Sequence, residues 1–155
     1  MLSHYPTRAA LGTTALVIFA AMMLTAPGSA QAKDNDNDTR ECSVATLQGQ
    51  YVFHASGFNI LAGVAQPKAI VELIHFNGDG SLYSPAATVS INGVVGRSSG
   101  SVGRYTVTSD CIGAVAFDHG PMFDLFVGFR QTELYLIQTG PGSPVFGGTA
   151  ERLSR

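Results

Sequence analysis

The stretch GRYTVTSDCIGAVAF, Gly103–Phe117, decides the fold because it contains two short strands and the turn that joins them. Tyrosine, threonine and valine favour extended backbone and fill its first half, while AVAF runs back after the turn. The turn, Asp110–Gly113, contains Cys111. A cysteine at the tip between two strands requires an explanation, and the beginning of the chain supplies part of it.

Residues 1–32 have the features of a secretory signal peptide. Arg8 precedes an apolar run from Ala15 to Leu24, and the small residues of Ala30-Gln31-Ala32 suit a cleavage site. An apolar core of about ten residues is too short to span a bilayer, which needs about 20. We therefore expect export to the periplasm or beyond the cell, a flexible polar leader at 33–41, and one domain at 42–155.

Both cysteines, Cys42 and Cys111, lie in the part of the chain that is expected to be exported. Two cysteines in an exported chain most simply form a disulfide. This disulfide would tie a turn between strands to the segment that leads into the first strand. A reactive or metal-binding thiol pair is the alternative, and neither a C-x-x-C spacing nor a neighbouring histidine supports it.

The rest of the domain alternates between strands and turns from Gly49 onward. The clearest hairpin is PKAIVELIHFNGDGSLYS, 67–84, whose apolar run ends at Asn77-Gly78-Asp79-Gly80. A further strand is predicted at 87–91, a long flexible loop at 91–103, and a brief helical turn at 43–47. About eight strands without a convincing helix indicate a sandwich or a closed barrel. Because the connections are short, we predict an all-β fold: a single antiparallel, mostly up-and-down barrel of about eight strands.

Several of these segments together resemble a group of uncharacterised small exported bacterial proteins. The shared features are a cysteine before a G-x-Y-x-F strand, an F-x-G-x-G hairpin, and G-x-Y-x-V-x-x-D-C. Here they are LQGQYVFHASG, HFNGDGSLY and GRYTVTSDCIGAVAF, with ELYLIQT and GGTAERL further on. The resemblance implies a small barrel similar to lipocalin-like or allene oxide cyclase-like folds. Such barrels host ligand carriage, cyclisation chemistry and inhibition, so the fold leaves the function open.

Composition and motifs argue against several kinds of chemistry. The charges are sparse and mixed, with a formal net charge of −2, so no nucleic-acid partner is expected. After cleavage no long apolar segment remains to enter a membrane. Glu72 and His75 lie three apart on one predicted strand, so they point to opposite faces and cannot readily share a metal ion with His54. The G-x-S-x-G run at 96–100 lacks the strand-to-helix turn of a nucleophile elbow. We therefore predict no catalytic residue, no metal site and no cofactor.

Apolar residues on both faces of one strand are the most informative feature. Between 69 and 76, one face has Ala69, Val71 and Leu73, and the other has Ile70, Ile74 and Phe76. A barrel in water needs only one apolar face, so the second indicates a subunit contact or a covered sheet. The barrel interior, as a packed core or as a ligand pocket, is predicted to be lined by Tyr51, Phe53, Leu73, Tyr105, Phe123, Leu125 and Phe129.

Three functions fit these patterns. The leading one is non-enzymatic binding of a small apolar ligand, with Tyr51 or Tyr105 orienting a polar end. The second is a structural or interaction protein of the envelope that forms a homo-oligomer. The third is a cyclase-like enzyme, which a cavity holding a buried Glu72 or Asp124 would favour.

Overall fold

The computed structural model of the protein describes residues 41–142 and 144–154. The predicted signal peptide (1–32) and the leader up to residue 40 lie outside the described residues, so both stay predictions. The elements are the 3₁₀-helix η1 (Val44–Thr46) and the strands β1 (Gln48–Leu61), β2 (Val64–Asn77), β3 (Ser81–Ile91), β4 (Val94–Ser98), β5 (Ser101–Val107), β6 (Ile112–Phe117), β7 (Met122–Val127), β8 (Glu133–Gly140) and β9 (Val145–Ser154).

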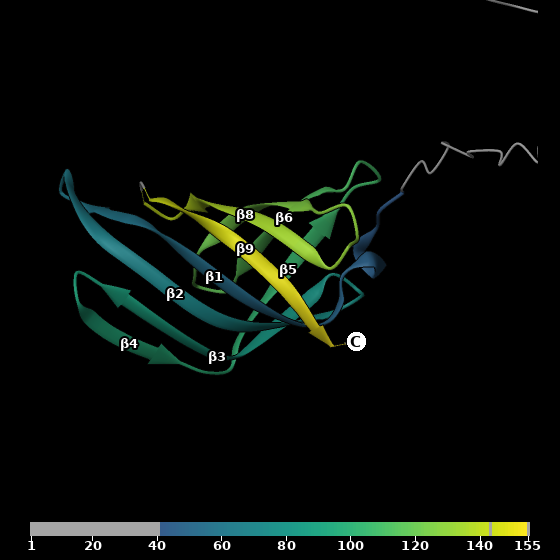
Figure 1. Cartoon of the computed structure of the whole chain (residues 1–155), viewed down its shortest axis with the longest axis horizontal. Coiled ribbons are helices and arrows are strands. Elements are labelled where there is room, and N and C mark those ends of the chain that lie inside the picture. The colour runs from purple at the N-terminus through teal and green to yellow at the C-terminus, as the bar shows by residue number, and fades with distance from the viewer. Residues whose placement is uncertain (1–40, 143, 155) are drawn as a thin grey trace, which may run out of the picture. The chain divides into compact units, whose positions relative to one another are not determined.

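Eight of these strands close into a ring. In the order β1, β2, β3, β5, β6, β7, β8 and β9, each strand pairs antiparallel with the next, and β9 pairs with β1. Phe53 and Ala150 are one of the residue pairs that join β1 to β9 and close the ring. The prediction of an antiparallel, mostly up-and-down barrel of eight strands is confirmed (Figure 1).

The period of two along each strand sets the core of the barrel. On β1, Tyr51, Phe53 and Ala55 point inward and are buried, whereas His54 and Ser56, which alternate with them, are exposed. The same alternation in the other strands brings one apolar cluster together inside the ring. Its members are Leu47, Tyr51, Phe53, Ala55, Ile74, Phe76, Leu82, Tyr105, Val115, Phe117, Phe123, Leu125, Leu134, Leu136, Phe146 and Ala150.

The ninth strand, β4, corrects the prediction of a long flexible loop at 91–103. Asn92 and Gly93 have φ angles of 50° and 84° and connect β3 to β4 by a two-residue turn. Positive φ at both positions matches the right-handed twist of the flanking strands, and Asn-Gly is the pair that adopts it most readily. The second arm of the predicted hairpin, 81–84, and the strand predicted at 87–91 are one continuous strand, β3.

The strands differ in length, and this makes one side of the barrel taller than the other. β1 and β2 have 14 residues each, whereas β6 and β7 have six. β3 pairs with β5 only over Ser81–Ser84 and then pairs with β4 over Ala87–Ile91. The outer halves of β1, β2 and β3, together with β4, therefore extend beyond the short strands as a twisted sheet, here called the wall (Figure 1).

The opposite end of the barrel is closed by the segment that precedes β1. Cys42 forms a disulfide with Cys111, as predicted, and η1 confirms the helical turn expected at 43–47. The Tyr105 hydroxyl lies 2.8 Å from the carbonyl oxygen of Val44 and 2.9 Å from that of Leu47. These contacts fix η1 across the end of the barrel.

Candidate functional site

The seven residues predicted to line the interior do not all lie there. Tyr51, Phe53, Tyr105, Phe123 and Leu125 are buried inside the ring. The Phe53 and Phe123 rings meet edge to face at 5.5 Å, so this part of the interior is packed core. Leu73 lies on the outer face of β2 and is only partly buried, and Phe129 follows β7 with 80% of its surface exposed. These two residues do not line the interior.

The two buried tyrosines use their hydroxyl groups to close the barrel. Arg152 Nε donates to the Tyr51 hydroxyl at 2.7 Å, and Arg152 Nη2 donates to the Thr46 carbonyl oxygen at 3.0 Å. The Tyr105 hydroxyl accepts a hydrogen bond from the Gly78 N–H at 3.0 Å, besides its contacts with η1. A role for either hydroxyl in orienting a ligand therefore has no support in the structure.

Glu72 is an acidic residue whose side chain is buried inside the barrel. It points inward from β2, is 7% exposed, and forms a side-chain hydrogen bond with Ser84. Burial raises the pKa of Glu72, and the bond to Ser84 offsets part of this effect. Asp124, the other carboxyl considered in the sequence, is exposed on β7. The predicted inward position of Leu73 would place Glu72 on the outer face of β2, and the structure reverses this.

The interior at the base of the wall is crossed by one lysine. Lys68 pairs with Gly57, and Gly57 pairs with Phe146. Because Gly57 has no side chain, Lys68 extends over it. Its Nζ lies 4.1 Å from the centroid of the Phe146 ring and donates to Gln138 Oε1 at 2.9 Å. Burial lowers the pKa of Lys68. Lys68 thus joins β2 to β8 across the interior.

The second apolar face predicted for residues 69–76 lies on the outside of the barrel. Ile74 and Phe76 point into the core, whereas Val71, on the other face, is 57% exposed. Ala69 and Leu73 share that outer face with Val71. Apolar surface on the wall therefore faces away from the core.

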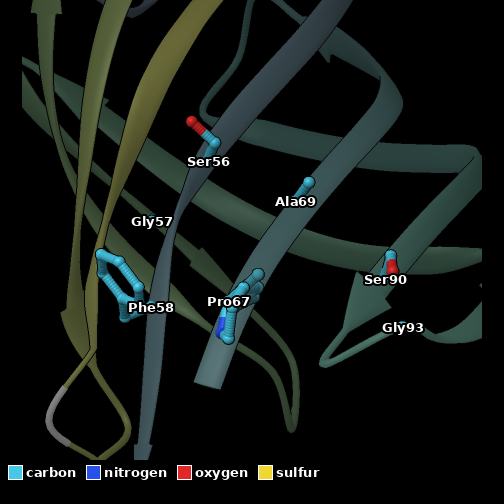
Figure 2. A pocket seen from close by; sticks show the side chains of 8 residues that line it. Ser56, Gly57, Phe58, Pro67, Ala69, Ser90 and Gly93 are labelled. Atoms are coloured by element: carbon cyan, nitrogen blue, oxygen red, sulfur yellow. The ribbon is translucent and has the colours of Figure 1, made fainter. Parts of the chain in front are cut away.

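This outer face contains a groove of about 470 Å³ (Figure 2). Ala69 lies in its middle, between Ser56 of β1 and Ser90 of β3, with which it pairs directly. Phe58 and Pro67, a second pair, lie next along the strands. Within the described part of the chain, the hydroxyl groups of Ser56 and Ser90 have no hydrogen-bond partner. The groove is lined by Ser56, Gly57, Phe58, Pro67, Lys68, Ala69, Ser90 and Gly93.

A smaller hollow of about 200 Å³ lies on β2 and β3. We call it the distal hollow. Its lining is mostly apolar and consists of Val71, Leu73, Ala86, Ala87 and Thr88. The partial exposure of Leu73, which removed it from the predicted interior, is explained by its place in this hollow.

Across 41–142 and 144–154, no three His, Cys, Asp or Glu side chains gather closely enough to hold a metal ion. The same residues include no helix with the length and hydropathy needed to cross a membrane. No family model, no curated protein and no solved structure matches this chain. The resemblance to small exported proteins and to lipocalin-like or allene oxide cyclase-like barrels therefore stays a prediction.

Proposed function

We propose that this β-barrel protein binds a small, largely apolar molecule in the groove on its outer face, without catalysing a reaction. The observation that supports the proposal is the groove itself. Its volume of about 470 Å³ lies within the range of small-molecule sites. Most of its lining surface is apolar, and the hydroxyl groups of Ser56 and Ser90, which have no partner among the described residues, can fix the orientation of a polar substituent.

The expected affinity follows from the surface that the groove can cover. A ligand that buries about 200 Å² of apolar surface gains about 5 kcal/mol from the hydrophobic effect. Hydrogen bonds to Ser56 and Ser90 add to this gain, whereas immobilising the ligand opposes it. Because the groove is open to solvent on one side, we expect dissociation constants from about micromolar to millimolar.

The test uses N-phenyl-1-naphthylamine, a compact neutral dye whose fluorescence rises in apolar sites. Ala69→Trp places an indole in the middle of the groove, while Ala114→Trp places one on the outer face of β6. We expect the first variant to weaken binding of the dye by about tenfold or more and the second to leave it unchanged. Unchanged binding to Ala69→Trp, or no binding to the wild-type protein, would contradict the proposal.

We expect the protein to bind its ligand outside the cytoplasm, because the chain is predicted to be exported. The predicted signal peptide indicates secretion, and the Cys42–Cys111 disulfide is of the kind that persists in oxidising compartments. A test is the cellular fraction in which the tagged full-length chain is found. Recovery of the uncleaved chain from the cytoplasm with free thiols would contradict export.

A homo-oligomer is the second candidate, and a different face of the barrel favours it. Ile112, Phe126 and Tyr135 lie in register across β6, β7 and β8, and each is exposed by nearly half. Three large apolar side chains in one outward row are a feature of contact surfaces. Sedimentation at tens of micromolar, compared with Phe126→Glu, tests this candidate. A wild-type protein that remains monomeric argues against it.

A further inference from the structure

The groove and the distal hollow are consecutive parts of one seam between β2 and β3. Every second residue of β2 contributes to the seam on the outer face, first Ala69, then Val71, then Leu73. The register pairs Ala69 with Ser90 and Val71 with Thr88. The first pair belongs to the groove and the second to the distal hollow. The two depressions therefore follow one another along the strands.

The seam becomes smaller from the groove to the distal hollow. From Ala69 to Leu73 it extends about 13 Å, at about 3.3 Å per residue. Its volume falls from about 470 Å³ in the groove to about 200 Å³ in the distal hollow. Hydroxyl groups flank the wide part, and Val71, Leu73 and Ala86 form most of the narrow part. This shape suits a molecule with a polar end and a linear apolar chain.

The charges on the outer face of the wall favour a negative polar end. Glu72 is the only acidic residue in β1–β4, and it points into the barrel. The outer face instead carries Arg97, which pairs with Thr88 directly beside the seam. No ion pair of Arg97 is present among the residues described. A flexible arginine can therefore turn toward an anion at the Ser90 side of the groove.

We propose that the seam binds a linear carboxylate amphiphile of the fatty-acid class. The carboxylate occupies the groove, where it accepts hydrogen bonds from Ser56 or Ser90 and lies within reach of Arg97. The alkyl chain lies along β2 over Val71 and Leu73 in the distal hollow. This inference rests on the proposed binding function and specifies the class of ligand and its direction along the strands.

Three probes separate the parts of the proposal: dodecanoate, dodecanol and N-phenyl-1-naphthylamine. Ala86→Trp fills the distal hollow, with Ala114→Trp as its matched control on another face. We expect Ala86→Trp to weaken the binding of dodecanoate about tenfold, because several methylene groups of the ligand lose apolar contact. The compact dye, which needs only the groove, keeps its affinity. Leu73→Ser, which makes the same hollow polar, is a second variant and weakens dodecanoate in the same direction.

The charge is tested with Arg97→Gln and with Arg104→Gln, a matched loss of an exposed arginine on β5. We expect Arg97→Gln to weaken the binding of dodecanoate about threefold and to leave the binding of dodecanol unchanged. Added salt should weaken the binding of dodecanoate and leave that of dodecanol unchanged.

The outcomes distinguish the two proposals. Dodecanoate that binds no more tightly than dodecanol to the wild-type protein would overturn the inference, as would dodecanoate binding that neither Ala86→Trp nor Leu73→Ser weakens. In either case, dye binding that Ala69→Trp abolishes keeps the proposed function intact. Failure of all three probes with the wild-type protein overturns both.

Discussion

Tyr105→Phe tests how the closed end of the barrel is held together. The substitution removes one oxygen atom and leaves the buried ring against Phe76, whose centroid is 4.9 Å away. The lost hydroxyl accepts a hydrogen bond from the N–H of Gly78, in the turn between β2 and β3. It also shares its proton between the carbonyl oxygens of Val44 and Leu47, at the two ends of η1.

The expected cost follows from these contacts. Loss of a hydrogen bond between protein groups costs about 1 kcal/mol, and a buried partner left unpaired costs about 1–3 kcal/mol. Since the variant leaves the Gly78 N–H and the two carbonyl groups without this partner, we expect a loss of about 2–3 kcal/mol. For a domain of this size, that lowers the melting temperature by roughly 10 °C.

The assay is urea unfolding followed by far-ultraviolet circular dichroism, with Tyr135→Phe as the matched control. The Tyr135 hydroxyl is exposed and donates only to the Glu133 carboxylate, at 2.9 Å. We expect the control to lose less than about 0.5 kcal/mol. Equal losses in the two variants, or a loss below about 0.5 kcal/mol in Tyr105→Phe, would refute the reasoning. The closed end would then depend on packing and the disulfide alone.

Three further predictions concern the disulfide, a glycine and a buried acid. Replacing Cys42 and Cys111 by serine opens a crosslink with a separation of 69 residues, so urea unfolding should show a loss of about 4 kcal/mol; a loss below about 1 kcal/mol contradicts this. Gly57→Ala forces a Cβ into a neighbouring backbone oxygen and should cost more than about 2 kcal/mol, whereas Gly96→Ala, which meets only a side chain at ordinary contact, should cost less than about 0.5 kcal/mol in the same assay. Burial in the folded state raises the pKa of Glu72. The buried carboxyl group therefore destabilises the fold increasingly as the pH rises above the pKa that Glu72 has in the unfolded chain. Glu72→Gln should therefore raise the melting temperature at about pH 8 and have little effect at about pH 4, and equal shifts at both would contradict the assignment.

The barrel was predictable from local signals that the fold uses directly. The turn glycines after Phe76, the alternation around Tyr51 and the cysteine at 111 each specify one feature that the structure contains. β4 was missed because a segment rich in glycine and serine resembles a flexible loop. The Asn92-Gly93 pair between two valine-containing segments was the signal that could have revealed it.

The faces of β2 were harder to assign because both carry apolar side chains. Without knowledge of the neighbouring strands, Leu73 was predicted to point inward, whereas Glu72 beside it is the residue that does. Phe129 has the inward parity of Phe123 but lies beyond the end of β7, where parity no longer applies. The groove could not be predicted at all. It depends on how three strands twist and on which small side chains the register places side by side.

The pairing of β9 with β1 has a consequence for the order in which the ring can assemble. β1 and β9 pair with each other although they lie at opposite ends of the described domain. During synthesis β1 is therefore made first and its partner β9 last. The hairpins between neighbouring strands can form early, but β9 and β1 can pair only after the last strand has been made. Until then, both unpaired margins of an open sheet are free to join another polypeptide. Protection against aggregation thus arrives only with the last few residues of β9.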